Sequence, residues 1–147
     1  MKNIVKKLII ISICSLFLQS CALNSEQERS LNIHISKYID SRNSCQILGL
    51  VGYTYPEFVQ ELTSNNDTVF VKFFNCMDDK KYFSNPTIRS TVKREKQIHV
   101  LFEMDEGSSS KKEKIVSITA DNGTTWYFLP YCIYQDKSNC KSLIRLL

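Results

Sequence analysis

The chain has 147 residues, of which 43% are hydrophobic, 23% charged and 11% aromatic. That length supports one domain rather than two, and the composition excludes a disordered or collagen-like chain. The formal net charge is +4, but residues 1–20 contain three lysines and no acidic residue, which leaves 16 basic and 15 acidic residues in the remainder. The basic charge therefore belongs mainly to the N-terminal segment and does not indicate nucleic-acid binding.

The N-terminal segment has the layout of a secretory signal. Met1–Lys7 is short and cationic, and Leu8–Leu18 is a continuous apolar run of eleven residues. A transmembrane helix needs about 20 apolar residues, so this run is too short to be an ordinary membrane span. The segment therefore predicts export from the cytoplasm.

The residues Leu18, Gln19, Ser20 and Cys21 follow this apolar run directly. They resemble the bacterial lipoprotein box, in which a leucine lies three residues before an invariant cysteine and a small residue precedes that cysteine. The resemblance implies acylation of Cys21, cleavage after Ser20 and a lipid anchor in the cell envelope. Because Ala22 rather than an aspartate follows the cysteine, it also implies the outer membrane, with the domain in the periplasm. The alternatives are an ordinary signal peptide with a chance cysteine, or an uncleaved anchor.

This interpretation divides the chain into a signal peptide (1–20), a lipidated tether (21–25) and a single domain (26–147) with a disulfide-bonded C-terminal tail. Cys14 is removed with the signal, and the domain keeps four cysteines: Cys45, Cys76, Cys132 and Cys140. An even number of cysteines in an exported domain predicts disulfides. We expect Cys132 to pair with Cys140, which is close in sequence, and Cys45 to pair with Cys76 by default. A zinc site is the alternative, but it normally uses closely spaced Cys-x₂₋₄-Cys pairs, and this chain has none.

Helical patterns come first in the domain. Ser25–Asn43 is predicted as a helix, with Ser25 and Glu28 as a capping box. Its apolar stripe consists of Leu31, Ile35, Tyr38 and Ile39. Cys45–Tyr53 is predicted as a short helix or a turn. A further helix begins at Tyr55-Pro56-Glu57 and ends at a polar turn over residues 64–67.

Strand patterns follow. The predicted strands are Thr68–Asn75, Thr87–Arg94, Gln97–Met104, Lys114–Ala120 and Thr125–Leu129. Met77–Asn85 and Asp105–Lys112 are predicted as connections. Alternation places Ile88, Ser90 and Val92 on one face of their strand, and Ile98, Val100, Phe102 and Met104 on one face of the next.

Two turns and the tail complete the strand pattern. Glu95-Lys96 is either a tight turn or a bulge within one long strand. Asn122-Gly123 predicts a type I′ hairpin turn. The tail Tyr131–Leu147 ends in Ser142–Leu147, predicted as an edge strand or a short helix.

Helices followed by an antiparallel meander predict an α+β fold, with N-terminal helices packed on a curved antiparallel sheet. The order of elements over residues 26–130 resembles the nuclear-transport-factor-2-like, or cystatin-like, α+β roll. So does the segment Ile115–Phe128, which is a strand, an Asn-Gly turn and a strand that contains Trp126. The resemblance implies a roll with either a pocket between helix and sheet or an exposed sheet used for dimerisation.

Few residues indicate chemistry. The two histidines are His34 and His99, and no nucleophile-elbow, zinc-protease or phosphate-loop motif is present. His34 is predicted at the boundary of the helix surface. His99 either faces solvent, opposite Ile98 and Val100, or serves as an acid–base group in a candidate pocket. Trp126 either packs in the core or lines that pocket. No catalytic residue, metal ligand or cofactor is predicted.

Two basic runs, Arg89–Lys96 and Lys111–Lys114, are either solvated or contact an acidic partner or lipid headgroups. The leading hypothesis is a non-enzymatic envelope lipoprotein that binds a protein or another envelope ligand, including the case of an immunity or exclusion factor. One alternative is a structural subunit of an envelope assembly. The other is a small enzyme that places His99, Asp40 or Glu103 in a pocket of the roll.

Overall fold

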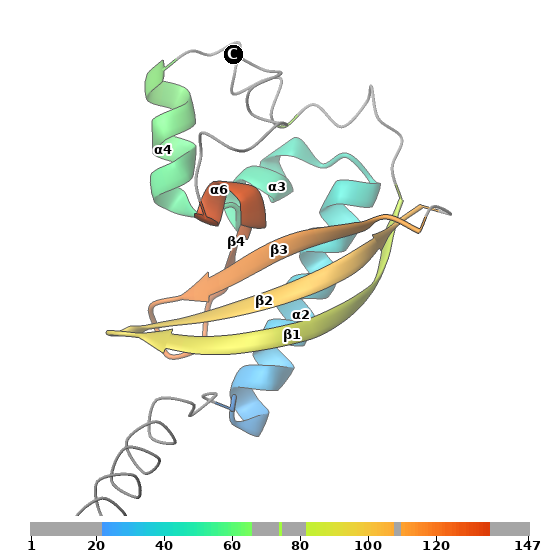
Figure 1. Cartoon of the computed structure of the whole chain (residues 1–147). Helices are drawn as coiled ribbons and strands as arrows, with labels where there is room; N and C mark the ends of the chain where they lie inside the picture. The colour runs from blue at the N-terminus through green and yellow to red at the C-terminus, as the bar shows by residue number, and fades with distance from the viewer. Residues whose placement is uncertain (1–21, 66–73, 75–81, 108–109, 136–147) are drawn as a thin grey trace, which may run out of the picture.

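The computed structural model of the chain describes residues 22–65, 74, 82–107 and 110–135. Helices α2 (Ser25–Asn43), α3 (Ile47–Tyr53) and α4 (Pro56–Asn65) come first, followed by strands β1 (Phe83–Arg94), β2 (Gln97–Glu106), β3 (Lys112–Thr119) and β4 (Tyr127–Pro130) and by helix α6 (Tyr131–Gln135). The four strands form one antiparallel sheet in the order β1-β2-β3-β4. The predicted α+β class, with helices before a curved antiparallel sheet, is confirmed (Figure 1).

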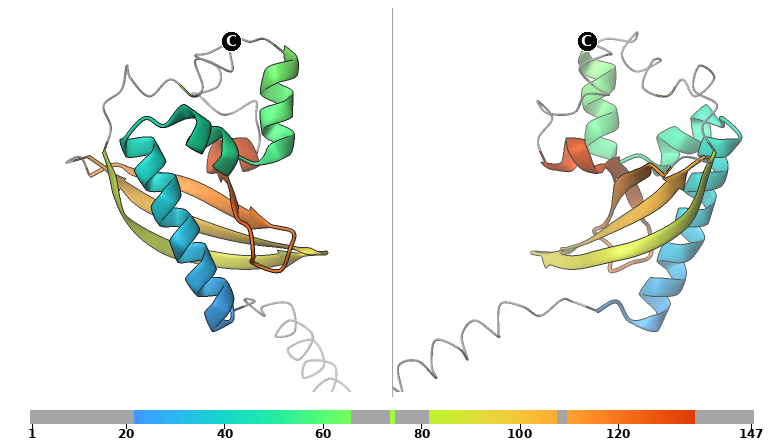
Figure 2. Two further views of the ribbon diagram at one scale, coloured as in Figure 1. Left: turned by 180° about the vertical axis from the view of Figure 1, so that it is seen from behind. Right: turned by 45° about the vertical axis from the view of Figure 1, so that its right-hand side comes forward.

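The long helix α2 crosses one face of the sheet diagonally, and the sheet curves around it (Figure 2). We call this covered face concave and the opposite face convex. Helices α3, α4 and α6 lie together beyond the β4 side of the sheet (Figures 1 and 2). The link between α3 and α4 joins the β4 edge, because the Tyr55 amide donates to the Phe128 carbonyl at 3.1 Å. No helix among the described residues is long and apolar enough to cross a membrane.

The predicted bounds and apolar stripe of α2 are confirmed, but its cap lies one residue earlier than expected. The N-cap is Asn24, whose side chain accepts a hydrogen bond from the Gln27 amide at 2.8 Å. The Gln27 side chain in turn accepts from the Asn24 amide at 3.1 Å, which completes a capping box. Ser25 and Glu28 form an overlapping pattern of the same kind, and the sequence alone does not separate the two.

The core lies between α2 and the concave face. The predicted inward row of β2 is confirmed, since Ile98, Val100, Phe102 and Met104 are all buried. Tyr38 of α2 stacks on Phe128 of β4 with ring centroids 4.5 Å apart. Burying each large apolar side chain contributes roughly 1.5–3 kcal/mol. This row therefore holds the helix against the sheet.

Polar contacts fix both ends of α2. At its last turn, the Asn43 side chain both donates to and accepts from the Phe83 backbone, at 2.9 and 2.8 Å. Arg42 pairs with Glu113 at 2.7 Å and lies over the Phe83 ring at 3.9 Å. At its first turn, the Gln27 side chain donates to the oxygen atoms of Asn122 in the β3–β4 connection. These contacts set which end of α2 lies at which end of the sheet.

Strand β1 differs from its prediction in two respects. It begins at Phe83 rather than Thr87, because the backbone of Phe83 is held by Asn43. It also contains register shifts between Ser84 and Thr87 and between Ile88 and Ser90. The second shift puts Ile88 opposite the inward Phe102, so Ile88 and Val92 do not share a face, contrary to the predicted alternation. Glu95-Lys96 is a tight turn, with Glu95 at φ 53.

The β3–β4 connection confirms the backbone prediction for Asn122-Gly123 but not the two-residue hairpin. Both residues have positive φ, 59 for Asn122 and 94 for Gly123. However, β3 ends at Thr119 and β4 begins at Tyr127, so seven residues, 120 to 126, lie between the strands. Within it, the Thr119 hydroxyl accepts from the Gly123 amide at 3.0 Å, and the Trp126 indole donates to the Gly123 carbonyl at 3.1 Å. These bonds hold a wide loop in place of a tight turn.

Other predictions fall partly or wholly outside the described residues. Of the strand predicted over 68–75, only Phe74 is described, and it is helical and buried, which contradicts a strand at that position. The predicted element over 142–147 lies outside the described residues. The start of the tail, residues 131–135, forms the helix α6, which the sequence did not predict.

Candidate interaction surface

Strand β1 forms the open edge of the sheet. Its position at the end of the strand order leaves one of its two sides unpaired by the described strands. From residue 85 to residue 94 every side chain is exposed except that of Thr91, which is half-buried. Two of the exposed side chains are apolar: Ile88 is 38% and Val92 is 46% exposed. An edge of this kind presents unpaired N–H and C=O groups to other chains.

The two halves of β1 differ. The first half contains Pro86, which has no N–H group, and both register shifts. The second half, Ser90–Arg94, pairs with β2 residue by residue without interruption. Proline and bulges protect an edge against further strand pairing. Protection by proline and bulges is therefore limited to the first half, and the second half has a regular backbone.

The exposed edge carries positive charge. The run Arg89–Lys96 contains four basic residues and one acidic residue, a net charge of +3. Arg89 is paired with Glu103 of β2 at 2.9 Å, and this hydrogen bond lowers the pKa of the Glu103 carboxyl. Among the described residues, Lys93 and Lys96 take part in no ion pair. Both side chains are exposed.

The convex face of the sheet carries further ion pairs. Lys114 of β3 lies 3.6 Å from the second oxygen of Glu103. Lys112 lies 3.7 Å from Asp105, which also accepts a hydrogen bond from Asn85 at 3.0 Å. These side chains are partly exposed, and pairs of this kind contribute only about 0–1 kcal/mol each. Lys112 and Lys114 of the second basic run are thus already paired within the sheet.

His99 is buried on the convex face, so the expectation that it faces solvent is wrong. Its Nδ1 lies 3.0 Å from the Tyr134 hydroxyl of α6, and its Nε2 lies 3.0 Å from Oε1 of Gln97. An amide oxygen only accepts, so Nε2 carries the proton and the Tyr134 hydroxyl donates to Nδ1. Burial, and then the charge of Arg94, lower the pKa of His99, which favours this neutral form.

The residues that bury His99 were not predicted from the sequence. Helix α6 places Tyr131 and Tyr134 in a stacked pair with centroids 6.3 Å apart. The Arg94 guanidinium lies 5.4 Å from the Tyr134 ring centroid, and Lys114 lies 6.0 Å from that of Tyr131. The spacing of the two tyrosines, three residues apart, is the signal that could have indicated a helix here.

The structure does not bring His99 and Trp126 together. Trp126 is fully buried in the core that α2 covers, whereas His99 points to the convex face. The other candidate acid–base groups are also apart from it. Asp40 is exposed on α2, and Glu103 is engaged by Arg89 and Lys114. His34 is half-buried and contacts the Ser30 carbonyl at 2.8 Å.

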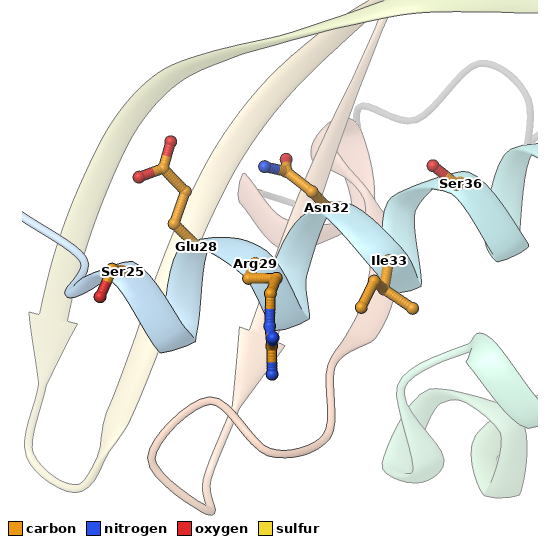
Figure 3. Close-up of a pocket in the computed structure, with 6 residues that line it drawn as sticks. All are labelled: Ser25, Glu28, Arg29, Asn32, Ile33 and Ser36. Atoms are coloured by element: carbon orange, nitrogen blue, oxygen red, sulfur yellow. The ribbon is translucent and has the colours of Figure 1, made fainter.

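Two surface hollows are lined by described residues, and neither contains His99, Trp126, Asp40 or Glu103. The first, of about 470 Å³, is lined by Ser25, Glu28, Arg29, Asn32, Ile33 and Ser36, all from α2. Figure 3 shows that these side chains leave the helix in different directions and do not converge on one point. The second, of about 420 Å³, lies among α3, α4 and Tyr127 of β4.

The cysteines are placed only in part. Cys45 and Cys132 are both disulfide-bonded. Their expected partners, Cys76 and Cys140, lie outside the described residues, as does the predicted lipidation site Cys21. The two pairings therefore stay predictions. No group of three or more potential metal ligands occurs among the residues that the structure describes.

Comparison with known proteins gives no further assignment. No protein-family model matches the chain, and no curated protein or solved structure is significantly similar to it. The resemblance to the lipoprotein box and to the α+β roll therefore stays a prediction.

Proposed function

We propose that the chain is a non-enzymatic lipoprotein of the bacterial cell envelope. It is anchored through acylated Cys21, on the periplasmic side of the outer membrane, and its domain binds a protein partner. The binding role rests on one observation, the open second half of β1. Natural sheets usually protect their edges by short strands, prolines, bulges, covering segments or charged side chains, especially lysine. Of these devices Ser90–Arg94 has only the charges of Lys93 and Arg94, since its ladder with β2 is regular and no described segment covers its other side.

Site-specific photo-crosslinking in cells tests the binding role. A photoreactive residue replaces Val92 in one strain and Ile33 in another. The two side chains are a matched pair, because both are β-branched and apolar and their exposed fractions are 46% and 47%. Val92 lies on the open edge, whereas Ile33 lies on the outer side of α2.

A discrete adduct from Val92 that is absent from Ile33 would support the proposed role. Adducts from Ile33 alone would place the interface on α2, and no adduct from either position would refute the binding role. Adducts recovered in fixed stoichiometry with a larger complex would identify a structural subunit. Unchanged toxin and phage sensitivity in cells lacking the protein would exclude an immunity or exclusion factor.

The anchor needs a separate measurement. The intact mass of the membrane-extracted protein, before and after reduction, should correspond to residues 21–147 plus acyl chains and should rise by four hydrogens on reduction. A Cys21→Ser variant should lose both the acyl mass and membrane attachment. An unlipidated wild-type protein would refute the proposed anchor without affecting the crosslinking result.

A further inference from the structure

We infer that Ser90–Arg94 of β1 binds an acidic, extended segment of the partner as an additional strand of the sheet. This inference rests on the proposed function and specifies the chemistry of its partner. It combines the regular open backbone of this half-strand with its positive charge.

The backbone of Ser90–Arg94 can pair with an added strand. In an antiparallel ladder the N–H and C=O groups of successive residues point alternately toward the two sides of the strand. The uninterrupted register from Ser90↔Leu101 to Arg94↔Gln97 therefore leaves a regular series of donor–acceptor pairs, one on every second residue, on the outer side. Before Ser90 the bulge and Pro86 interrupt that spacing. An added strand should therefore pair with Ser90–Arg94 and not with Ser84–Ile88.

The side chains give the added strand two different faces. Val92 lies opposite His99 on the convex face, and its exposed side chain offers an apolar contact beside a buried neighbour. Lys93 lies opposite Ile98, on the other face. Side chains directly across an antiparallel pair interact most strongly. A partner strand with an apolar residue beside Val92 and a carboxylate beside Lys93 fits both faces.

Charge selects an acidic segment over a second copy of this chain. Two β1 edges would each bring a run of net charge +3 to the contact. Like charges placed opposite each other in a sheet are destabilising. An acidic strand would instead meet Lys93 and Lys96, which have no ion-pair partner among the described residues. The competing explanation is that these charges only prevent edge-to-edge aggregation.

The experiment uses the purified full-length protein in detergent and a ten-residue peptide of alternating glutamate and valine with blocked ends. A peptide with lysine in place of glutamate is the control ligand. Affinity is measured by fluorescence anisotropy at low salt. Strand addition is measured by amide hydrogen exchange and mass spectrometry on fragments that cover 84–88 and 90–94.

We expect the acidic peptide to bind, and binding should slow exchange in 90–94 but not in 84–88. Lys93→Glu should weaken binding about tenfold, or about 1.4 kcal/mol, because the reversal replaces an attraction at roughly 5–6 Å in water with a repulsion. Lys37→Glu is the matched control, since Lys37 is an exposed lysine on α2 and the change in charge is the same. It should leave the affinity unchanged.

Several outcomes would overturn the inference. Equal binding of the lysine peptide, or binding without slower exchange in 90–94, would show that no acidic strand is added. If exchange in 90–94 is already slow without peptide and becomes slower as the protein concentration rises, the occupant of the edge would be a second copy of the chain. Absence of binding together with a Val92 adduct in cells would refute the acidic strand and leave the proposed function intact. Loss of affinity for phosphatidylglycerol vesicles in Lys93→Glu, with no peptide binding, would assign the charges to lipid headgroups.

Discussion

Replacing Gly123 by alanine should be among the most destabilising small substitutions in the domain. Gly123 has φ +94, and an added Cβ would lie 2.7 Å from Cγ and 3.4 Å from Cα of Gln27. The positive φ alone costs an alanine about 1–2 kcal/mol. Gln27 must also move, although its side chain donates to two oxygens of Asn122 at 3.1 and 2.9 Å. Losing these two bonds adds about 0.5–1.5 kcal/mol each, so the expected total is about 3 kcal/mol.

Two other glycines separate the cost of positive φ from the cost of the contact with Gln27. Gly107 has φ +61 with no atom within 4 Å of an added Cβ, so Gly107→Ala should lose only the backbone contribution of about 1–2 kcal/mol. Gly52 lies in α3 with open space around it, and Gly52→Ala should gain about 0.4–1 kcal/mol. Urea unfolding followed by circular dichroism gives the three free energies of unfolding.

The Gln27 contact is tested by a double-mutant cycle. In a Gln27→Ala background most of the clash is removed, so the further loss caused by Gly123→Ala should shrink toward that of Gly107→Ala. The reasoning fails if Gly123→Ala is no worse than Gly107→Ala in the wild-type background. It also fails if the Gln27→Ala background leaves the loss unchanged, because the loop would then not depend on its contact with α2.

Three further substitutions test other contacts. Trp126→Phe removes the hydrogen bond to the Gly123 carbonyl and part of a fully buried ring. The free energy of unfolding in urea should fall by about 2 kcal/mol, and a fall of less than about 0.5 kcal/mol would contradict this packing. Burial and then the charge of Arg94 lower the pKa of His99 in the folded protein. As the pH falls below about 6.5, the unfolded chain therefore binds the proton more readily than the folded protein does, and the free energy of unfolding of the wild type should decrease between pH 7 and pH 5. His99→Gln, which cannot take up this proton, should not show the decrease. Arg42→Ala leaves the Glu113 carboxylate without its partner at 2.7 Å. It should lower the free energy of unfolding by about 2 kcal/mol, which is more than the loss in Glu113→Gln. Equal losses in the two variants would contradict the added cost of an unpaired carboxylate.

The sequence predicts the elements of this fold where periodicity and burial agree. Leu31 and Ile35 recur at helical spacing, and both are buried on the inner side of α2. Val100 and Phe102 alternate along a central strand, and both are fully buried. In each case one apolar face determines the position of the element, because any other register would expose it. The bounds of α2 and the inward row of β2 were predictable for this reason.

Prediction failed where a distant contact decides the local structure. The cap of α2 lies at Asn24 because Gln27 also bonds to Asn122, 95 residues away. The hairpin widens because Trp126 and Thr119 bond within the loop. The bulge after Ile88 occurs on an edge strand whose side chains are mostly exposed, so no hydrophobic pattern specifies the register there. None of these determinants can be read from local propensity.

The candidate surface could be predicted only in part, for a similar physical reason. The basic run Arg89–Lys96 was recognisable as charge, but its meaning depends on the sheet order, which the sequence did not give. A basic run on a central strand would be constrained by neighbours on both sides. Because β1 is the edge of the described sheet, the same residues combine charge with backbone groups that no described strand pairs. The edge position is thus the observation on which the proposed binding role of Ser90–Arg94 rests.

The contacts of α2 also locate the proposed binding strand, Ser90–Arg94, relative to the proposed anchor. Gln27, in the first turn of α2, donates a hydrogen bond to Asn122 in the loop after β3. At this end of the sheet Thr119 of β3 pairs with Ile98 of β2, which in turn pairs with Lys93 of β1. The last turn of α2 instead holds Phe83, at the opposite end of β1. Ser90–Arg94 therefore lies toward the end of the domain at which the chain from Cys21 enters. Because α2 is 19 residues long, its last turn lies about 28 Å from its first turn. With the anchor at Cys21, a partner in the same membrane would reach the open half of β1 before the protected half.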